Sequence, residues 1–405
     1  MSIEIISIGD EMLSGAYVNT NAAYISRLLS ENGWKVVRHT ALPDNEKQLF
    51  AGVCEALERS EIVITTGGLG PTIDDLTRPV MAKIFDSDFH YDAQIAEHLI
   101  ARYGKQLASL ENQATIPTKA QPILNDVGTA PGLIFRRKKN ILICLPGVPV
   151  EMESMMKNQV IPYLLKQDLH REKRVKETLH FCALNESAID KVLQEMQRKG
   201  VEIGIYPGFG TVTVCLFAAN LEDIKPLKET LLKKFATHIF SSESGTLEEA
   251  LQTWMISHKK TLAVAESCTG GKIASLLTAI PGASNYFLGS LVTYSNVLKQ
   301  KILHIPEKIL NDSGAVSAET VKEMVTHLLH ITEADYGIAV SGIAGPAGGT
   351  LEKPVGTIWA ALMEKGEEPI AWKFKANGNR QKIISMAAAR AISALYQKIV
   401  YHIDP

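Results

Sequence analysis

The sequence predicts an α/β protein in which two doubly wound α/β domains are joined by a small α+β module. Up to about residue 165, short β-branched runs alternate with longer helical stretches. This order is typical of a parallel sheet covered by helices on both faces. The rhythm changes near Arg171, and the alternation returns from Thr246. We therefore expect domains over residues 1–168, 169–245 and 246–405, with Ser241–Gly245 as a joint.

In the first domain, helices are expected over Asn21–Asn32 and Lys47–Glu58, between strands at EIISIG, WKVVRHTAL and EIVITTGG. The segment GLIFRRKKNILICLPG contains two apolar runs split by a basic turn, which predicts a hairpin. A further helix follows Pro149 and ends near Ile161. These elements give the first domain its predicted sheet and its covering helices.

The middle segment is predicted to have the order strand, helix, strand, strand, helix, strand. The strands are RVKETLHFCAL, the two halves of VEIGIYPGFGTVTVCLFAA, and THIFSS, and the helices are NESAIDKVLQEMQRKG and LEDIKPLKETLLKKFA. In the last domain we expect strands at LAVAES, FLGSLVTYS, YGIAVSGIAG and VGTIWAALM.

The composition excludes several classes of protein. The 405 residues carry a net charge of −2, so no bulk field favours a polyanion, and we interpret the basic run Arg136–Lys139 as a solvated turn. The five cysteines form no C-x-x-C pair, which argues against a disulfide framework and a zinc knuckle. No window of about 20 residues lacks charged or turn residues. We expect a cytoplasmic protein that binds neither membrane nor nucleic acid.

A candidate nucleophile follows the strand TLAVA. The turn Glu266–Gly271 places the hydroxyl of Ser267 at the carboxyl end of the sheet, next to helix N-terminal amides that favour negative charge. A serine needs a base. Lys299 lies 32 residues later, at the end of the next strand together with Tyr294, so these groups are expected to converge. The alternative is that Ser267 caps a helix and Lys299 lies on the surface.

This turn is open to two other interpretations. Cys268 is a rival nucleophile, although no histidine nearby has an obvious orienting partner. Gly270-Gly271-Lys272 resembles the end of a phosphate-binding P-loop, but Ile273 stands where that motif requires a serine or threonine. A nucleotide triphosphatase is therefore not favoured.

A glycine-rich segment supplies a candidate anion-binding loop after the strand YGIAV. Backbone amides in Ser341–Thr350 have the freedom to wrap an anion, and the alternative is a mobile surface loop. Arg380 adds a cation ahead of the last helix, unless it is simply solvated.

The first domain has a second group of candidates at its strand ends. Glycines bring backbone amides close to a phosphate, and nearby carboxylates bind Mg²⁺ or a similar divalent metal. The expected phosphate-binding residues are Gly67, Gly68, Gly70 and Thr72, and the expected metal ligands are Asp10, Asp75 and Glu151. The alternative is that the acidic residues cap helices, and Asn19–Asn21 is likewise interpreted as a helix cap.

The motifs AESCTGG, VTYSN-x-x-K, GAVS, SGIAGP-x-GG and KPVGT closely resemble the nicotinamide mononucleotide (NMN) amidohydrolase domain of the competence/damage-inducible protein A (CinA) family. The resemblance implies hydrolysis of NMN to nicotinic acid mononucleotide and ammonia, without a cofactor. It makes Ser267 the nucleophile, Lys299 the base and Tyr294 a supporting hydroxyl, and it places Glu266 and Arg380 in the active site. The substrate-binding residues are then expected to be Cys268, Thr269, Gly270, Gly271, Ser341, Gly342, Gly345, Gly348, Gly349 and Arg380.

The motifs GDE, TTGGLGPT-x-DD-x-T and PG-x-P-x-EM resemble the molybdopterin-binding fold that begins CinA proteins. In some members this domain hydrolyses ADP-ribose with a divalent metal, and members commonly form homodimers. Asn185-Glu186-Ser187 departs from the Gly-rich turn expected in the middle module. Two rival functions are a DNA-uptake or recombination accessory, as the family name suggests, and a regulatory nucleotide-binding protein without amidase activity.

Overall fold

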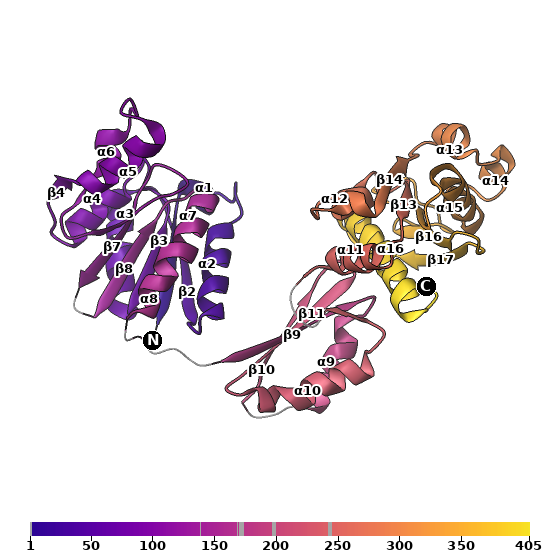
Figure 1. The fold of residues 1–405 in the computed structure, drawn as a ribbon, viewed down its shortest axis with the longest axis horizontal. Coiled ribbons are helices and arrows are strands. Elements are labelled where there is room, and N and C mark those ends of the chain that lie inside the picture. The colour runs from indigo at the N-terminus through magenta and orange to yellow at the C-terminus, as the bar shows by residue number, and fades with distance from the viewer. Residues whose placement is uncertain (1, 138, 168, 170–173, 197–199, 242–244) are drawn as a thin grey trace. The chain divides into compact units, whose positions relative to one another are not determined.

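The computed structural model describes residues 2–137, 139–167, 169, 174–196, 200–241 and 245–405 (Figure 1). The chain forms two compact units, residues 1–173 and residues 174–405. The predicted joint at Ser241–Gly245 and the boundary at 168/169 fall partly outside the described residues. The division of the second unit at residue 245 stays a prediction.

The first unit is built on a six-stranded sheet with the order β2-β1-β3-β8-β7-β6. The first four strands of this order are mutually parallel, whereas β7 and β6 are antiparallel. The predicted hairpin is confirmed, because β7 pairs with β8 around Arg137 and Asn140. The strands are β1 (Ile3–Ile8), β2 (Val36–Leu42), β3 (Ile62–Thr66), β6 (Gln121–Ile123), β7 (Gly132–Arg137) and β8 (Asn140–Leu145), with a separate small pair, β4 (Phe89–Tyr91) and β5 (Thr115–Pro117).

Helices cover both faces of this sheet. One core joins the sheet to α3, α4 and α5, and the other joins it to α2, α7 and α8. Because each face is covered, β1 is apolar on both sides: Ile6 and Ile8 face the first core, and Ile3 and Ile5 face the second. The helices are α1 (Asp10–Leu13), α2 (Thr20–Glu31), α3 (Glu46–Arg59), α4 (Thr77–Ile84), α5 (Ala93–Tyr103), α6 (Leu110–Ala114), α7 (Pro149–Met155) and α8 (Ile161–Leu165). A short π-helical segment over Met156–Val160 joins α7 to α8.

The second unit begins with a four-stranded antiparallel sheet in the order β10-β11-β9-β12. The predicted order of strands and helices is confirmed. Two helices cover one face, with Leu179 and Phe181 of the sheet packed against Ile189 and Leu227. The elements are β9 (Val175–Cys182), α9 (Glu186–Glu195), β10 (Glu202–Pro207), β11 (Thr211–Ala218), α10 (Leu221–Lys234) and β12 (Ile239–Ser241).

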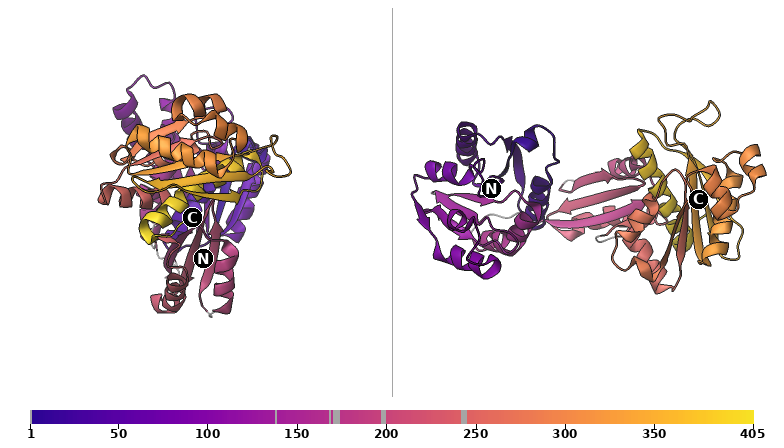
Figure 2. Two further views of the ribbon diagram at one scale, coloured as in Figure 1. Left: turned by 90° about the vertical axis from the view of Figure 1, so that its right-hand side faces the viewer. Right: turned by 90° about the horizontal axis from the view of Figure 1, so that it is seen from above.

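The rest of the second unit is a five-stranded sheet in the order β14-β13-β15-β16-β17. Helices lie on both sides of it (Figure 2): α11, α12 and α16 pack on one face, and α13, α14 and α15 on the other. The strands are β13 (Leu262–Glu266), β14 (Phe287–Val292), β15 (Tyr336–Gly342), β16 (Thr357–Glu364) and β17 (Ile370–Lys375). The helices are α11 (Leu247–Ser257), α12 (Lys272–Thr278), α13 (Asn296–Leu303), α14 (Glu307–Asp312), α15 (Ala318–Thr332) and α16 (Arg380–Tyr401).

The α/β class is confirmed, but neither large sheet is wholly parallel. Strands β16 and β17 run antiparallel to their neighbours. A parallel connection needs a crossover, usually a helix, whereas the chain between β15 and β16 forms a loop that contains no helix. The strand β17 was not expected from the sequence.

The helix α16 is long and apolar enough to match a membrane span in composition. In the described part of the chain no other helix meets that test, and 67% of the 18-residue window concerned is buried inside the protein. A helix buried to this extent is typical of the core of a folded domain.

Candidate active site

The candidate nucleophile Ser267 lies at the carboxyl end of the central strand β13. Its backbone N–H donates to the carbonyl oxygen of Val340 in β15 at 3.0 Å. The side chain is 7% exposed. Because β14 and β15 flank β13 and run parallel to it, the ends of all three strands meet around this serine.

Lys299 reaches Ser267 from the first half of α13. Its Nζ donates to Ser267 Oγ at 2.9 Å and to the carbonyl oxygens of Thr293 and Tyr294 at 2.8 and 3.4 Å. The lysine is 1% exposed. The structure therefore brings Ser267 and Lys299 together, and Lys299 is not on the surface.

Burial changes the acid–base behaviour of this lysine. It lowers the pKa of Lys299 from 10.5 to about 8, because the acceptors around Nζ are uncharged oxygens that do not offset the cost of burying an ammonium. At pH 7 roughly one lysine in ten is then neutral, and above pH 8 most are. Lys299 can therefore accept a proton near neutral pH.

Cys268 has the opposite character. Burial raises the pKa of its thiol to about 12, so the nucleophilic thiolate is scarce at neutral pH. The sulfur packs against the backbone of β15, where a Cβ added to Gly342 would lie 3.1 Å from Sγ. The geometry favours Ser267 over Cys268 as the nucleophile.

The carboxylate of Glu266 is fully buried, and it forms hydrogen bonds with other groups of the protein. It accepts hydrogen bonds from the backbone N–H groups of Gly271, Ile273 and Ala274 at 2.9–3.1 Å, and from Ser290 Oγ at 3.0 Å. The amides at the start of α12 do favour negative charge as expected, but these three bind a carboxylate of the protein itself and not a ligand. Glu266 acts as a positioning residue that fixes the turn carrying Ser267.

Two amides of the turn remain available. The N–H of Gly270 donates to the carbonyl oxygen of Ser267 at 3.2 Å, whereas the N–H groups of Cys268 and Thr269 donate to no described residue. The hydroxyl of Thr269 is also buried without a hydrogen-bond partner in the described part of the chain. Cys268 and Thr269 thus offer the free donors beside Ser267.

Tyr294 does not hold Lys299 through its hydroxyl. That hydroxyl accepts from Arg380 Nη2 at 2.8 Å, and only the backbone oxygen of Tyr294 contacts the lysine. The other guanidinium nitrogen, Nη1 of Arg380, donates to the carbonyl oxygen of Gly345 at 2.7 Å. Arg380 therefore links the segment after β14 to the glycine-rich loop after β15.

The glycine-rich loop is partly structural. The hydroxyl of Ser341 is buried and donates to the carbonyl oxygen of Ala315 at 2.7 Å. Gly345 has a φ of +75° and lies against Val355, so a side chain there would be strained and crowded. Gly348 and Gly349 are exposed, and their N–H groups donate to no described residue. The exposed half of the loop is the part able to contact a ligand.

In the first unit, the predicted phosphate loop is closed by its own residues. Asp75 accepts from the N–H groups of Gly70 and Thr72 at 2.8 and 2.9 Å, and also from the Thr72 hydroxyl. Gly67 has a φ of +115°, and a Cβ there would lie 2.2 Å from the Ile8 carbonyl oxygen. Gly68 likewise has a φ of +65°. The glycines are needed because the backbone is tightly folded here.

The structure does not gather Asp10, Asp75 and Glu151 into a metal centre. No group of three or more His, Cys, Asp or Glu side chains among the described residues is able to hold a metal ion. Asp75 is turned into its own loop, and Glu151 Oε2 accepts from Asn125 Nδ2 at 2.7 Å. These residues do not fit a resident divalent metal.

Asp10 lies instead among other carboxylates of this unit, which influence the pKa of Asp44. Burial, followed by the charges of Asp10, Glu11 and Asp74, raises the pKa of Asp44. The N–H of Asp10 donates to Asp44 Oδ2 at 3.2 Å. Asp44 follows β2, the parallel neighbour of β1, so strand order is consistent with this grouping, although Asp44 was not among the expected metal ligands.

The first unit contains a cavity of about 500 Å³ next to Thr66, the residue that precedes the glycine loop. The ends of β1 and β3 and the start of α2 line this cavity. Asn21 Nδ2 donates to Thr66 Oγ1 at 2.9 Å and to the Gly147 carbonyl oxygen at 2.8 Å. Its Oδ1 is buried and has no partner among the described residues. Of the residues expected to form a helix cap, Asn19 does cap α2, whereas Asn21 lines the cavity and has a buried acceptor without a partner among the described residues.

Similarity to known proteins covers nearly the whole chain. The family model "CinA C-terminal domain" matches residues 244–399, and "Probable molybdopterin binding domain" matches residues 4–166. A CinA-like protein of Prochlorococcus marinus is 37% identical over 373 residues, which cover 89% of this chain and 86% of that protein. One of Endomicrobium trichonymphae is 35% identical over 427 residues, covering 99% of both chains.

Solved structures match the chain in part. The protein CinA of Thermoplasma acidophilum is 37% identical, covering 40% of this chain and 96% of its own, with a TM-score of 0.38. The relatives that match over nearly the full length, together with the two family models, establish the family. The chain belongs to the CinA family.

Proposed function

We propose that the second unit hydrolyses nicotinamide mononucleotide to nicotinic acid mononucleotide and ammonia, with Ser267 as nucleophile and Lys299 as base. The observation that carries the proposal is the 2.9 Å contact between Lys299 Nζ and Ser267 Oγ, made by two buried side chains. A serine paired with a lysine of lowered pKa suits attack on an amide. The choice of substrate rests on the motifs that resemble the NMN amidohydrolase domain.

In the first half of the reaction, neutral Lys299 takes the proton of Ser267 Oγ as that oxygen attacks the carboxamide carbon. The tetrahedral intermediate carries an oxyanion, which the free amides of Cys268 and Thr269 are placed to bind. One such donor is typically worth about 3 kcal/mol of the barrier. Lys299 then returns the proton to the amide nitrogen, the C–N bond breaks, and ammonia leaves an ester on Ser267.

In the second half, a water molecule gives a proton to Lys299 and attacks the ester carbon. The same amides bind the second oxyanion, and Lys299 returns the proton to Ser267 Oγ as the C–O bond breaks. The product is the carboxylic acid, and the enzyme returns to its starting state. Every proton transfer uses Lys299, which is why its lowered pKa matters for the rate.

The phosphate of the substrate is assigned to Arg380 and the exposed part of the glycine-rich loop. Arg380 is held by Gly345 and Tyr294, which fixes its guanidinium without neutralising its charge. Binding energy from a remote phosphate places the carboxamide against Ser267. This arrangement predicts a preference for the nucleotide over the unphosphorylated nucleoside.

For the first unit we propose nucleotide binding, with ADP-ribose as the candidate ligand. The support is the cavity of about 500 Å³ and the unpartnered Oδ1 of Asn21 beside the glycine loop. The proposal stops at binding and includes no pyrophosphatase step, because the carboxylates of the described residues do not fit a resident metal. Dimerisation and a cytoplasmic location stay predictions.

Ser267→Ala and Lys299→Arg should each reduce ammonia release from NMN by roughly a thousandfold or more, because one lacks the nucleophile and the other cannot give up a proton near neutral pH. NMN binding should persist in Ser267→Ala. The control variants are Cys268→Ala, which keeps the serine, and Lys301→Arg, an exposed change in the same helix. Full activity in Ser267→Ala, or loss of activity only in Cys268→Ala, would refute the mechanism.

The rate should rise with pH. Because the base must be neutral and the pKa of Lys299 is lowered to about 8, kcat/KM for NMN should increase between pH 7 and 9 and level off above that. Ammonia release measured across this range at constant ionic strength tests the expectation. A profile that is flat, or that falls over the same range, is incompatible with Lys299 as the base.

Arg380→Ala should raise the KM for NMN about tenfold or more with a smaller effect on kcat, because a charge-assisted contact to phosphate is lost. Hydrolysis of nicotinamide riboside, which lacks the phosphate, should change little. Lys373→Ala removes an exposed charge from β17 and serves as the control. Equal losses on both substrates would show that Arg380 does not bind the phosphate.

Asn21→Ala should weaken ADP-ribose binding by roughly tenfold, because the ligand loses a buried acceptor. Calorimetric titration measures this, and ammonia release from NMN should stay unchanged. Asn45→Ala removes another asparagine, one whose side chain only caps α3, so it should affect stability rather than binding. Unchanged ADP-ribose affinity in Asn21→Ala would move the ligand away from this cavity.

A further inference from the structure

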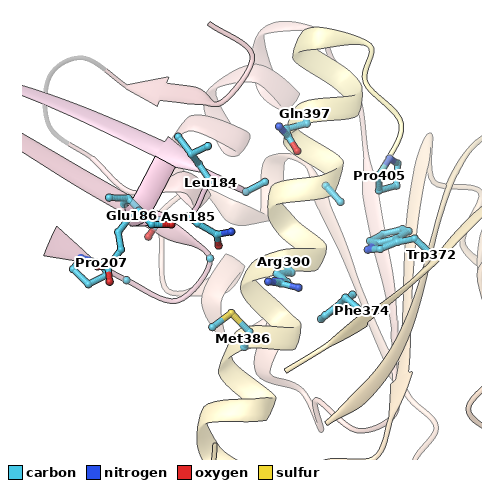
Figure 3. A pocket seen from close by; sticks show the side chains of 17 residues that line it. Leu184, Asn185, Glu186, Pro207, Trp372, Phe374, Met386, Arg390, Gln397 and Pro405 are labelled. Carbon is cyan, nitrogen blue, oxygen red and sulfur yellow. The ribbon is translucent and has the colours of Figure 1, made fainter. Parts of the chain in front are cut away.

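A cavity of about 680 Å³ lies within the second unit (Figure 3). Its walls are the start of α9, the β10–β11 turn, one face of α16 and the aromatic side chains of β17. None of Ser267, Lys299 or Arg380 lines it. Its volume falls within the roughly 300–1,000 Å³ typical of small-molecule sites. Neither the motifs nor the proposed amidase mechanism assigns it a role.

The elements that line this cavity pack against one another. A Cβ added to Gly210 in the β10–β11 turn would lie 3.2 Å from the Cβ of Ala389 in α16. At the other end of α16, the hydroxyl of Tyr396 donates to the carbonyl oxygen of Phe240, and that of Tyr401 to Ile239. The cavity is therefore lined by elements that pack together.

One cationic side chain, that of Arg390, is among the described residues that line the cavity. Arg390 lies with its guanidinium carbon 5.1 Å from the centroid of the Phe374 ring. A guanidinium placed over an aromatic ring can still donate from its N–H groups to a carboxylate or phosphate. Opposite it, the side chain of Asn185 does not cap α9, and the N–H groups of Glu186 and Ser187 donate to no described residue.

The remaining lining suits a flat ring that carries a hydrogen-bond donor. Trp372 and Phe374 are two residues apart on β17, so they share one face of the strand. Gln397 is only 9% exposed, and its Nε2 is held by the Thr237 carbonyl oxygen and by His238 Nδ1 at 3.1 and 3.2 Å. Its Oε1 has no partner in the described part of the chain, and it is therefore a fixed acceptor.

We propose that this cavity binds an anionic, planar aromatic small molecule of mononucleotide size. Its phosphate contacts Arg390 and the free amides at the start of α9, its ring lies against Trp372, and a ring amine or amide donates to Gln397 Oε1. Glu186 is the one acidic side chain among the described lining residues, and it is exposed. Its charge opposes the anion. The proposal stands whether or not the Ser267 site hydrolyses NMN.

The test uses the full-length protein and AMP as the probe. Binding is measured by equilibrium dialysis and by tryptophan fluorescence. Arg390→Met, which keeps an apolar stem of similar length, should weaken AMP binding roughly tenfold or more, and Arg390→Lys should recover part of it. Lys382→Met removes an exposed charge from the same helix outside the cavity and should leave binding unchanged.

Further variants and probes separate the contributions of charge, aromatic ring and phosphate to AMP binding. Glu186→Gln should tighten AMP binding, because it removes the opposing charge. Trp372→Phe should abolish the fluorescence change while dialysis still detects binding, since phenylalanine keeps a stacking surface. Adenosine and ribose 5-phosphate should each bind more weakly than AMP. Asn21→Ala should not affect the fluorescence titration, which separates this cavity from the one in the first unit.

Three results would overturn the proposal. The first is a failure to detect AMP binding at millimolar concentration. The second is unchanged AMP affinity in Arg390→Met, or an equal loss in Lys382→Met. The third is tighter AMP binding in Arg390→Met with weaker AMP binding in Glu186→Gln, which would mean that the phosphate does not contact Arg390.

Discussion

A single buried carboxylate holds the candidate active site in shape. Glu266 ends β13, and it binds three backbone N–H groups at the start of α12 and the hydroxyl of Ser290 in β14. The helix N-terminus offsets the negative charge, so the carboxylate is stable without a cationic partner. The strand, the turn and the helix are thereby fixed relative to one another, and the position of Ser267 follows from that arrangement.

The same architecture makes Lys299 reactive. Its helix begins directly after β14, so its side chain must cross the end of the sheet to reach Ser267, and the surrounding protein excludes water from it. Carbonyl oxygens of Thr293 and Tyr294 hold the amine in place. They do not neutralise an ammonium as a carboxylate would. The burial that is costly for stability is therefore what lowers the pKa of the amine into a useful range.

Much of this was predictable from the sequence because it follows from strand order. Neighbouring parallel strands end at one edge of the sheet, so the approach of Ser267 to Lys299 could be inferred from spacing. The direction of side chains could not. Tyr294 follows the right strand, yet its hydroxyl turns towards Arg380. The acidic residues of the first unit likewise follow the expected strands, but Asp75 turns into its own loop, and the described residues contain no metal-binding group.

Features that depend on distant contacts gave no sequence signal. The antiparallel direction of β16 could not be predicted, because an apolar strand has the same sequence pattern in parallel and antiparallel sheets. The free Oδ1 of Asn21 is recognised only once Thr66 and Gly147 occupy its amide nitrogen. The cavity lined by Arg390 joins segments separated by nearly the whole second unit. Sequence patterns report local periodicity, whereas such sites are created by packing between elements.

The helix α16 connects the two sites of the second unit. Arg380 is its first residue and Arg390 lies ten positions further on, which is about 15 Å along a helix. Between them Ala387, Ala388 and Ala389 are buried, and such small side chains allow other elements to pack closely against the helix. The cation assigned to the substrate phosphate and the cation of the proposed second cavity therefore belong to one packed helix, and the fold that positions one also positions the other.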